Sequence, residues 1–219
     1  MTARKLRGII EHGESDTVEF KRKFSGYDKI AKEMIALANT RGGWLLIGID
    51  DDGRIVGVDS EKSEVDLAVT AAEFHSDPPI ENTIHIVDID GTDVVAIEIP
   101  ESRAKPHKLV PSQGNGAVED PDGTRVYIRQ GDRSVIASRE VARVLALSAP
   151  EAPPLRLEIG DIERVLFAFL EQHGRVTLRQ YRHLVNVSQR RASRSLVRLV
   201  RAGLIRLFTD EGEDYYTLA

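Results

Sequence analysis

The chain has 219 residues, 41% of them hydrophobic, and a formal net charge of −5. It has no cysteine, which excludes disulfide bonds and thiolate metal sites. No apolar run reaches the length of a membrane span, and no apolar segment follows the basic residues at the N-terminus. We therefore expect a cytoplasmic protein with no membrane partner.

The charge is divided unevenly along the chain. Residues 1–154 hold 19 Lys and Arg against 27 Asp and Glu, a net charge of −8, whereas residues 155–219 hold 11 against 8, a net charge of +3. Just before this change, residues 148–154 are rich in Pro and Ala, as in a stiff linker. The sequence therefore predicts two domains, 1–147 and 155–219, joined by that linker.

The first domain is predicted to open with a short strand at 18–21. Val18 and Phe20 alternate with Glu19 and Lys21, so we expect the first pair in the core and the charged pair facing solvent or a cleft. The next predicted elements are a helix over 30–38, a central strand over 44–49, a turn at 51–53 and a returning hairpin strand over 54–58.

The remaining elements of this domain are predicted as a helix over 60–74, strands over 83–89, 94–99 and 125–129, and a helix over 138–147. A long loop, 100–124, interrupts them, and loops of that length inside a compact domain are commonly functional. Together these elements predict an α+β fold with a mixed, mainly antiparallel sheet.

The second domain is predicted to contain three helices and a hairpin. The helices cover 162–173, 177–185 and 189–202, and strands over 204–208 and 215–218 flank an acidic turn. This order resembles a winged helix-turn-helix, in which the third helix enters the major groove of DNA. The outward face of that helix would carry Gln189, Arg190, Ser193, Arg194 and Arg198.

The third helix is the clearest indication of a nucleic-acid partner. Residues 175–206 contain nine arginines and no acidic residue, so no Asp or Glu one turn away neutralises the helix. A solvated surface or a protein-binding face are alternatives, but a helix that carries only cations is typical of phosphate binding. We therefore expect this domain to bind DNA.

Three motifs follow one another in the first domain: Glu14-x4-Glu19-Phe20-Lys21, the run from Asn39 through Gly42-Gly43 to Asp51, and Tyr127-Ile128-Arg129-Gln130-Gly131. Together, over about residues 8–147, they resemble the Schlafen core domain, whose bacterial and archaeal relatives form a family of Alba-like DNA-binding domains. The resemblance implies an α+β domain that binds nucleic acid.

The resemblance to Schlafen ribonucleases implies that Glu14, Glu19 and Asp51 are catalytic and metal-binding, with Asp50 as the alternative to Asp51. Such carboxylates would hold Mg²⁺ or Mn²⁺ beside a phosphodiester, and Lys21 would stabilise the developing charge. The same residues also fit an ordinary hairpin turn and an exposed cross-strand pair. No organic cofactor is expected.

Further nucleic-acid contacts are expected from Arg103, Lys105 and Lys108 in the long loop, and from Arg129. A Schlafen horseshoe has two lobes and this chain supplies one, so we expect a homodimer that restores the second lobe. The sequence thus predicts a DNA-binding regulator. The alternatives are a metal-dependent endonuclease that cuts structured RNA or DNA, and an adaptor that docks a partner along its edge strands.

Overall fold

The computed structural model describes residues 1–112, 125–149, 152–210 and 213–219, and it divides into two compact units, Met1–Ala137 and Ser138–Ala219. The predicted α+β class with mainly antiparallel sheets is confirmed. Within the described ranges, no helix is long and apolar enough to cross a membrane.

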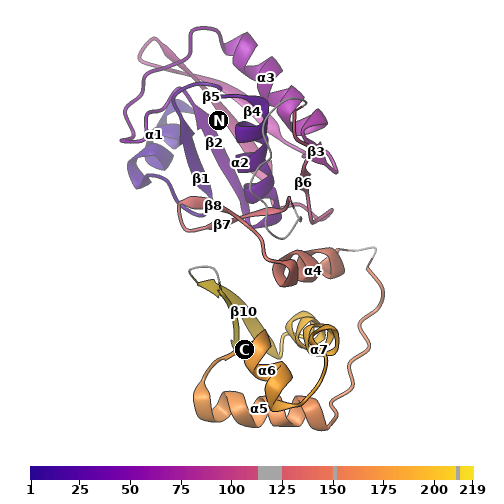
Figure 1. Cartoon of the computed structure of the whole chain (residues 1–219). Coiled ribbons are helices and arrows are strands. Elements are labelled where there is room, and N and C mark those ends of the chain that lie inside the picture. The colour runs from indigo at the N-terminus through magenta and orange to yellow at the C-terminus, as the bar shows by residue number, and fades with distance from the viewer. Residues whose placement is uncertain (113–124, 150–151, 211–212) are drawn as a thin grey trace. The chain divides into compact units, whose positions relative to one another are not determined.

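A four-stranded sheet forms the centre of the first unit (Figure 1). Across the sheet, its strands are β1 (Val18–Lys21), β2 (Gly42–Ile47), β5 (Thr92–Pro100) and β4 (Thr83–Ile89). β1 pairs with β2 in parallel, and the other pairs are antiparallel. The predicted central strand is confirmed, because β2 lies between β1 and β5 and its residues Leu45, Leu46 and Ile47 are fully buried.

Helices cover both faces of this sheet (Figure 1). On one face α1 (Ala3–His12) buries Leu6 against Phe20 and Leu46. On the other face α2 (Tyr27–Asn39) and α3 (Glu61–Phe74) pack apolar side chains on β2 and β5. α1 is absent from the sequence prediction, although Thr2 caps its first turn.

Two small sheets complete the first unit: β3 (Ser76–Asp77) with β6 (Lys108–Leu109), and β7 (Tyr127–Gln130) with β8 (Arg133–Ile136). The sequence did not predict β8. The prediction of a returning strand at 54–58 is wrong, because only Ile55 bridges Ile49 there and the N–H groups of Val56 and Gly57 both donate to the Gly48 carbonyl. Part of the predicted long loop, 113–124, lies outside the described residues.

The second unit consists of helices around a small sheet with strand order β10-β11-β9. Its elements are α4 (Arg139–Ser148), α5 (Asp161–His173), β9 (Val176–Thr177), α6 (Leu178–Leu184), α7 (Gln189–Arg201), β10 (Ile205–Asp210) and β11 (Glu213–Leu218). Tyr181 and Tyr216 are fully buried in its core with Leu196 and Leu199. Three helices followed by a hairpin are therefore present in the predicted order.

Helix α4 groups with the second unit, whereas the sequence prediction placed residues 138–147 in the first domain. Polar contacts account for the difference. Arg143 Nη1 donates to Ser193 Oγ of α7 at 2.7 Å, and Ser193 Oγ donates to Glu140 Oε1 at 3.2 Å. Ser138, which caps α4, also donates to the Asp214 carboxylate on β11.

Glycine is required where the chain enters β2. Gly43 has φ +143°, and a Cβ built on it would lie 2.0 Å from the carbonyl oxygen of Thr17, just before β1. Gly91, in the β4–β5 turn, also has a positive φ (+81°), but nothing lies within 4 Å of a Cβ there. The two positions therefore separate the cost of backbone conformation from the cost of steric contact.

We predict that Gly43→Ala lowers the free energy of unfolding by about 2–5 kcal/mol. Left-handed backbone costs about 1–2 kcal/mol and the added clash about 1–3 kcal/mol. Gly91→Ala should cost only the first part. Urea unfolding followed by the fluorescence of Trp44, the single tryptophan, reports on this unit. Equal losses in both variants would contradict the close approach of the chain at Gly43.

Candidate functional site

Glu19, predicted as a catalytic carboxylate facing solvent or a cleft, is buried. It lies on β1, and only 8% of its side chain is exposed. Arg129 on β7, whose side chain has no exposed surface, donates from Nη1 to Glu19 Oε2 at 2.6 Å. Lys21 Nζ contacts the other carboxylate oxygen. A carboxylate is stable in such a place only with a matched counter-charge, which these two cations supply.

Arg129 is also the centre of a wider buried network. Its Nη1 donates to Ser134 Oγ at 3.1 Å and lies 3.5 Å from Glu33 Oε2, and its Nη2 donates to the Ser15 carbonyl at 2.6 Å. The sequence analysis expected Arg129 to contact nucleic acid. In this structure its guanidinium is enclosed, because β7 turns it inward toward two buried carboxylates.

The remaining carboxylates gather near the start of β1. Glu14 Oε1 accepts the backbone N–H of Phe20 at 2.8 Å. Burial raises the pKa of the half-buried Glu14 carboxyl, the Phe20 N–H opposes this rise, and the charges of Glu19 and Asp51 add to it. The predicted residues Glu19, Lys21 and Asp51 are therefore close enough to Glu14 for their charges to act on its carboxyl.

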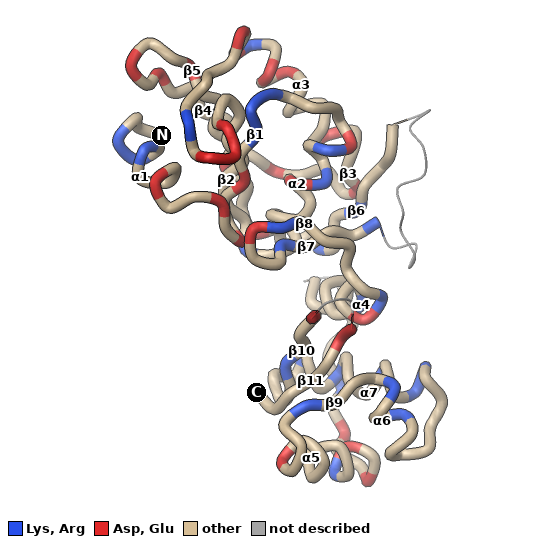
Figure 2. The backbone as a smooth tube through the Cα atoms, turned by 60° about the vertical axis from the view of Figure 1, so that its left-hand side comes forward, with Lys and Arg blue, Asp and Glu red and all other residues tan. Residues whose placement is uncertain are grey.

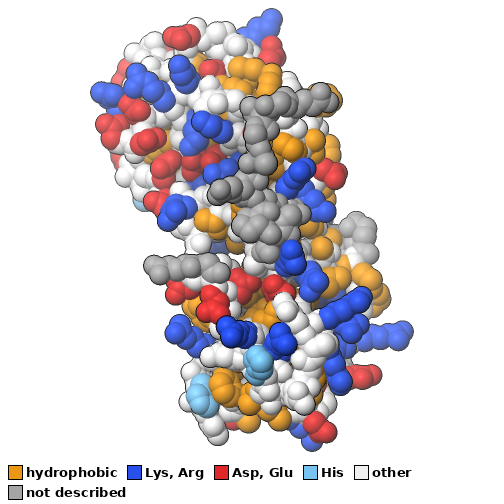
Figure 3. All heavy atoms as spheres, in the orientation of Figure 1, with side chains coloured by type: hydrophobic (Ala, Val, Ile, Leu, Met, Phe, Trp, Pro, Cys, Tyr) orange, Lys and Arg blue, Asp and Glu red, His pale blue; other side chains and the backbone are white. Residues whose placement is uncertain are grey.

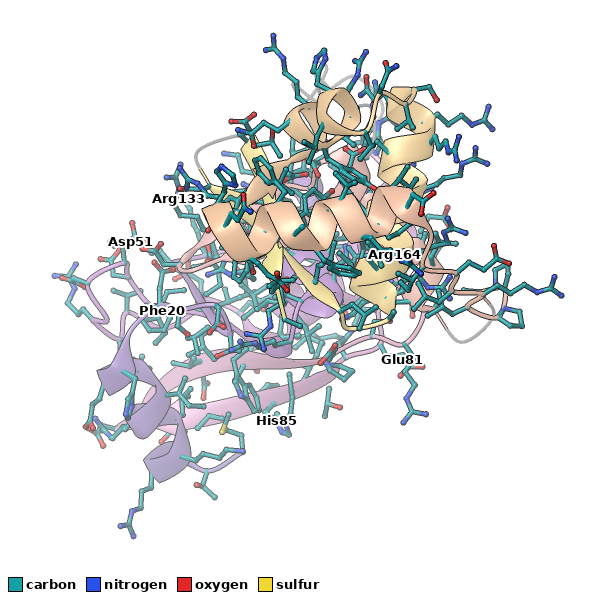
Figure 4. The ribbon with its side chains drawn as sticks, turned by 90° about the horizontal axis from the view of Figure 1, so that it is seen from below. Phe20, Asp51, Glu81, His85, Arg133 and Arg164 are labelled. Atoms are coloured by element: carbon teal, nitrogen blue, oxygen red, sulfur yellow. The ribbon has the colours of Figure 1, made fainter. Side chains whose placement is uncertain are left out.

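Asp50 and Asp51 differ in their surroundings. Asp50 Oδ2 accepts from Arg54 at 2.7 Å and from Arg22 at 3.1 Å, and the Arg54 hydrogen bond is the main cause of a lowered pKa at Asp50. Asp51 is exposed in the loop after β2 (Figure 4). The side chain that faces solvent at this point is thus that of Asp51.

The carboxylates do not form a metal site in the part of the chain that the structure describes. No group of three or more His, Asp or Glu residues there could hold a metal ion. The chemistry of the donors agrees, because the oxygens of Glu19 are taken up by Lys21 and Arg129 rather than left for a cation. As they lie here, Glu14, Glu19 and Asp51 do not fit Mg²⁺ or Mn²⁺.

Of the three loop cations that were expected to contact nucleic acid, only two are exposed to solvent. Arg103 and Lys108 are exposed. The side chain of Lys105 is only 13% exposed, and its Nζ donates to Glu101 Oε1 at 2.6 Å and to the Thr40 carbonyl at 2.9 Å. Lys105 therefore holds the loop against the end of α2, while the other two cations face solvent.

Helix α7 carries the largest group of exposed arginines in the described chain, and its basic positions recur along the helix (Figure 2). Gln189, Arg190, Arg194 and Arg198 are exposed, as the prediction of a nucleic-acid face requires. Arg191, which the sequence analysis did not select, is exposed beside them. Among the described residues, none of the arginines at 190, 191, 194 and 198 forms an ion pair.

Ser193 departs from this pattern. It was predicted to contact nucleic acid, but only 1% of it is exposed because Arg143 and Glu140 of α4 contact its hydroxyl. Arg143 is the contributor that the sequence analysis missed. Its position in a helix assigned to the other domain gave no sign that it would lie beside α7.

Comparison with known proteins assigns most of the first unit to a protein family. A profile of the Schlafen, AlbA_2 family matches residues 14–138, more than half of the chain. A comparison with curated proteins found no match.

Two solved structures are similar. The N-terminal domain of a RecG-related protein from Nitrosomonas europaea is 24% identical with a TM-score of 0.42, and the match covers 64% of this chain and 96% of that one. The DIP2311 protein from Corynebacterium diphtheriae is 18% identical with a TM-score of 0.48, and the match covers 90% of this chain and 34% of that one. The chain therefore spans about a third of the length of the second protein.

We predict that Arg129→Met destabilises the first unit by about 3–5 kcal/mol, because it leaves Glu19 and Glu33 buried without their main counter-charge. Arg133→Met is the matched control, since Arg133 is exposed at the start of β8 in the same hairpin (Figure 4). The control should change the free energy by about 0.5 kcal/mol or less. Urea unfolding followed by Trp44 fluorescence measures both, and equal midpoints would contradict the buried network.

Glu14 gives a pH-dependent prediction. The pKa of Glu14 in the folded state is raised above its ordinary value of about 4.5. As the pH rises, the unfolded chain therefore loses this proton first. The free energy of unfolding then falls across the window from about 4.5 to the folded pKa. Glu14→Gln does not titrate. We therefore expect the stability of Glu14→Gln relative to wild type to increase between pH 4 and pH 7. A decrease in paired urea titrations would show that Glu14 is held in its charged form.

Proposed function

Because the chain belongs to the Schlafen AlbA_2 family of nucleic-acid-related domains, we propose that it binds nucleic acid and acts as a DNA-binding regulator. The observation that carries this proposal is the row of exposed arginines on α7, which have no acidic partner in the described chain. Figure 3 displays basic side chains gathered over the part of the second unit where α7 lies. Guanidinium groups in this arrangement suit phosphate oxygens.

We propose further that the second unit is a winged helix-turn-helix, with α7 as its DNA-contacting helix and β10–β11 as its wing. Two features support this assignment. The elements α5, β9, α6, α7, β10 and β11 follow one another in the order of that module. The Thr177 capping box starts α6, and Ser188 caps α7 after the short turn that separates the two helices.

A homodimer remains part of the proposal. β4 lies at one edge of the sheet, so this edge offers unpaired backbone groups to a second copy, and Ile86 on it is half exposed. Light scattering of the full chain with and without duplex DNA tests the point. A monomer in both conditions would remove the dimer and leave DNA binding by single chains.

A second candidate function is the endonuclease, and one observation favours it. The charges of Glu19 and Asp51 both act on Glu14, so the three carboxylates implied by the Schlafen resemblance share one region. Incubation with transfer RNA and with duplex DNA, in Mn²⁺ or in chelator, separates the two functions. Binding without metal-dependent cleavage supports the regulator, whereas cleavage that is lost in Glu14→Gln supports the nuclease.

We predict that Arg190→Gln with Arg194→Gln weakens duplex binding at least about tenfold and lowers the slope of log affinity against log salt by about 1.8, because two phosphate contacts are lost. The control is Arg156→Gln with Arg164→Gln, which removes the same charge from exposed positions outside α7. Fluorescence anisotropy at several salt concentrations gives both quantities. Equal effects of the two pairs would assign the binding to net charge rather than to α7.

A further inference from the structure

A groove between α4 and α7 adds a feature that the winged-helix assignment does not explain. It has a volume of about 480 Å³ and is lined by Arg143 and Leu147 of α4 and by Arg191, Arg194, Val197 and Arg198 of α7. Four of its six lining residues are arginines. The other two, Leu147 and Val197, give it an apolar floor.

The position of this groove on α7 is unusual for a helix that reads base edges. In helix-turn-helix proteins, side chains from the N-terminal half of the recognition helix reach into the major groove. Here Ser193 and Val197, one turn apart on the side of α7 that faces α4, are only 1% and 2% exposed. Ser193 is covered by α4 through Arg143 and Glu140. The side of α7 that faces α4 is therefore covered, and the charged rim of the groove beside it is open.

The open rim suits a sugar–phosphate backbone. Arg191, Arg194 and Arg198 are exposed and without ion pairs in the described chain, and half of the Arg143 side chain is exposed. An acidic group, Glu140, lies 3.8 Å from Arg143 Nη1. Guanidinium groups bind phosphate oxygens in pairs of hydrogen bonds, and the apolar floor matches the carbon face of a sugar. Among the described residues that line the groove none is aromatic, so they offer no surface on which a base would stack.

We propose that α4 is part of the nucleic-acid interface, and that the groove between α4 and α7 holds the phosphate backbone with Arg143 as one of its binding residues. This inference rests on the proposed function. It adds that the second unit binds with little dependence on base sequence, because phosphate contacts position a protein without reading bases. It also requires α4 to stay on α7 in the complex.

The first test is Arg143→Gln in the full chain, with Arg164→Gln on α5 as control. We expect Arg143→Gln to weaken binding about three- to tenfold at moderate salt and to lower the salt slope by about 0.9, with no effect in the control. The loss should be the same for duplexes of unrelated sequence, and wild-type affinities for them should agree within about threefold. Single-stranded DNA, RNA and inorganic phosphate, run in parallel, identify which source of phosphate the groove accepts.

The second test locks α4 in place. The chain has no cysteine, so Glu140→Cys with Ser193→Cys introduces one thiol on each helix, at positions whose native side chains are hydrogen-bonded to each other. We expect the oxidised form to bind DNA as well as the reduced form of the same variant. Loss of binding on oxidation, or an Arg143→Gln variant that matches wild type, would overturn the inference and leave DNA binding by an uncovered α7. A wild-type chain that binds no nucleic acid even at low salt would instead defeat the proposed function itself.

Discussion

The buried ion pair between Arg129 and Glu19 is the constraint on which the first unit depends. It joins β7 to β1 across 110 positions of sequence, and through Glu33 it reaches α2 as well. Charged groups inside a protein are costly unless they are paired, so displacing any one of these elements would leave a buried charge without its partner. The same contact decides what the motif residues do, because it places Glu19 and Arg129 in the interior, where they hold the domain together.

Exposed basic charge is arranged differently in the two units. In the first unit, several cations are engaged by neighbouring acids, as with Arg22 and Arg54 at Asp50 and Lys105 at Glu101. In the second unit, the arginines of α7 have no such partners among the described residues. An anionic ligand would therefore be attracted chiefly to α7 and its neighbour α4. The proposed binding of nucleic acid is therefore compatible with a chain whose net charge is −5.

The sequence predicted the elements that have strong local patterns. The apolar run over 44–49 predicted β2, the strands predicted over 83–89 and 94–99 correspond to β4 and β5, and the helix predicted over 189–202 corresponds to α7. Burial that depends on distant residues was not predictable. Glu19 alternates like a surface residue, and only the position of Arg129 makes its burial stable. Ser193 likewise looks exposed on its own helix until α4 covers it.

The central claim is that nucleic acid contacts the α4 and α7 arginines and leaves the Glu14–Lys21 region untouched. Nuclear magnetic resonance of the ¹⁵N-labelled chain, titrated with duplex DNA, measures this residue by residue through backbone amides and arginine Nε–H signals. The account predicts that the largest shifts occur at Arg143, Arg191, Arg194 and Arg198. Shifts concentrated at Glu14, Lys21 and Asp51, with α7 unchanged, would contradict it and place the interface in the first unit.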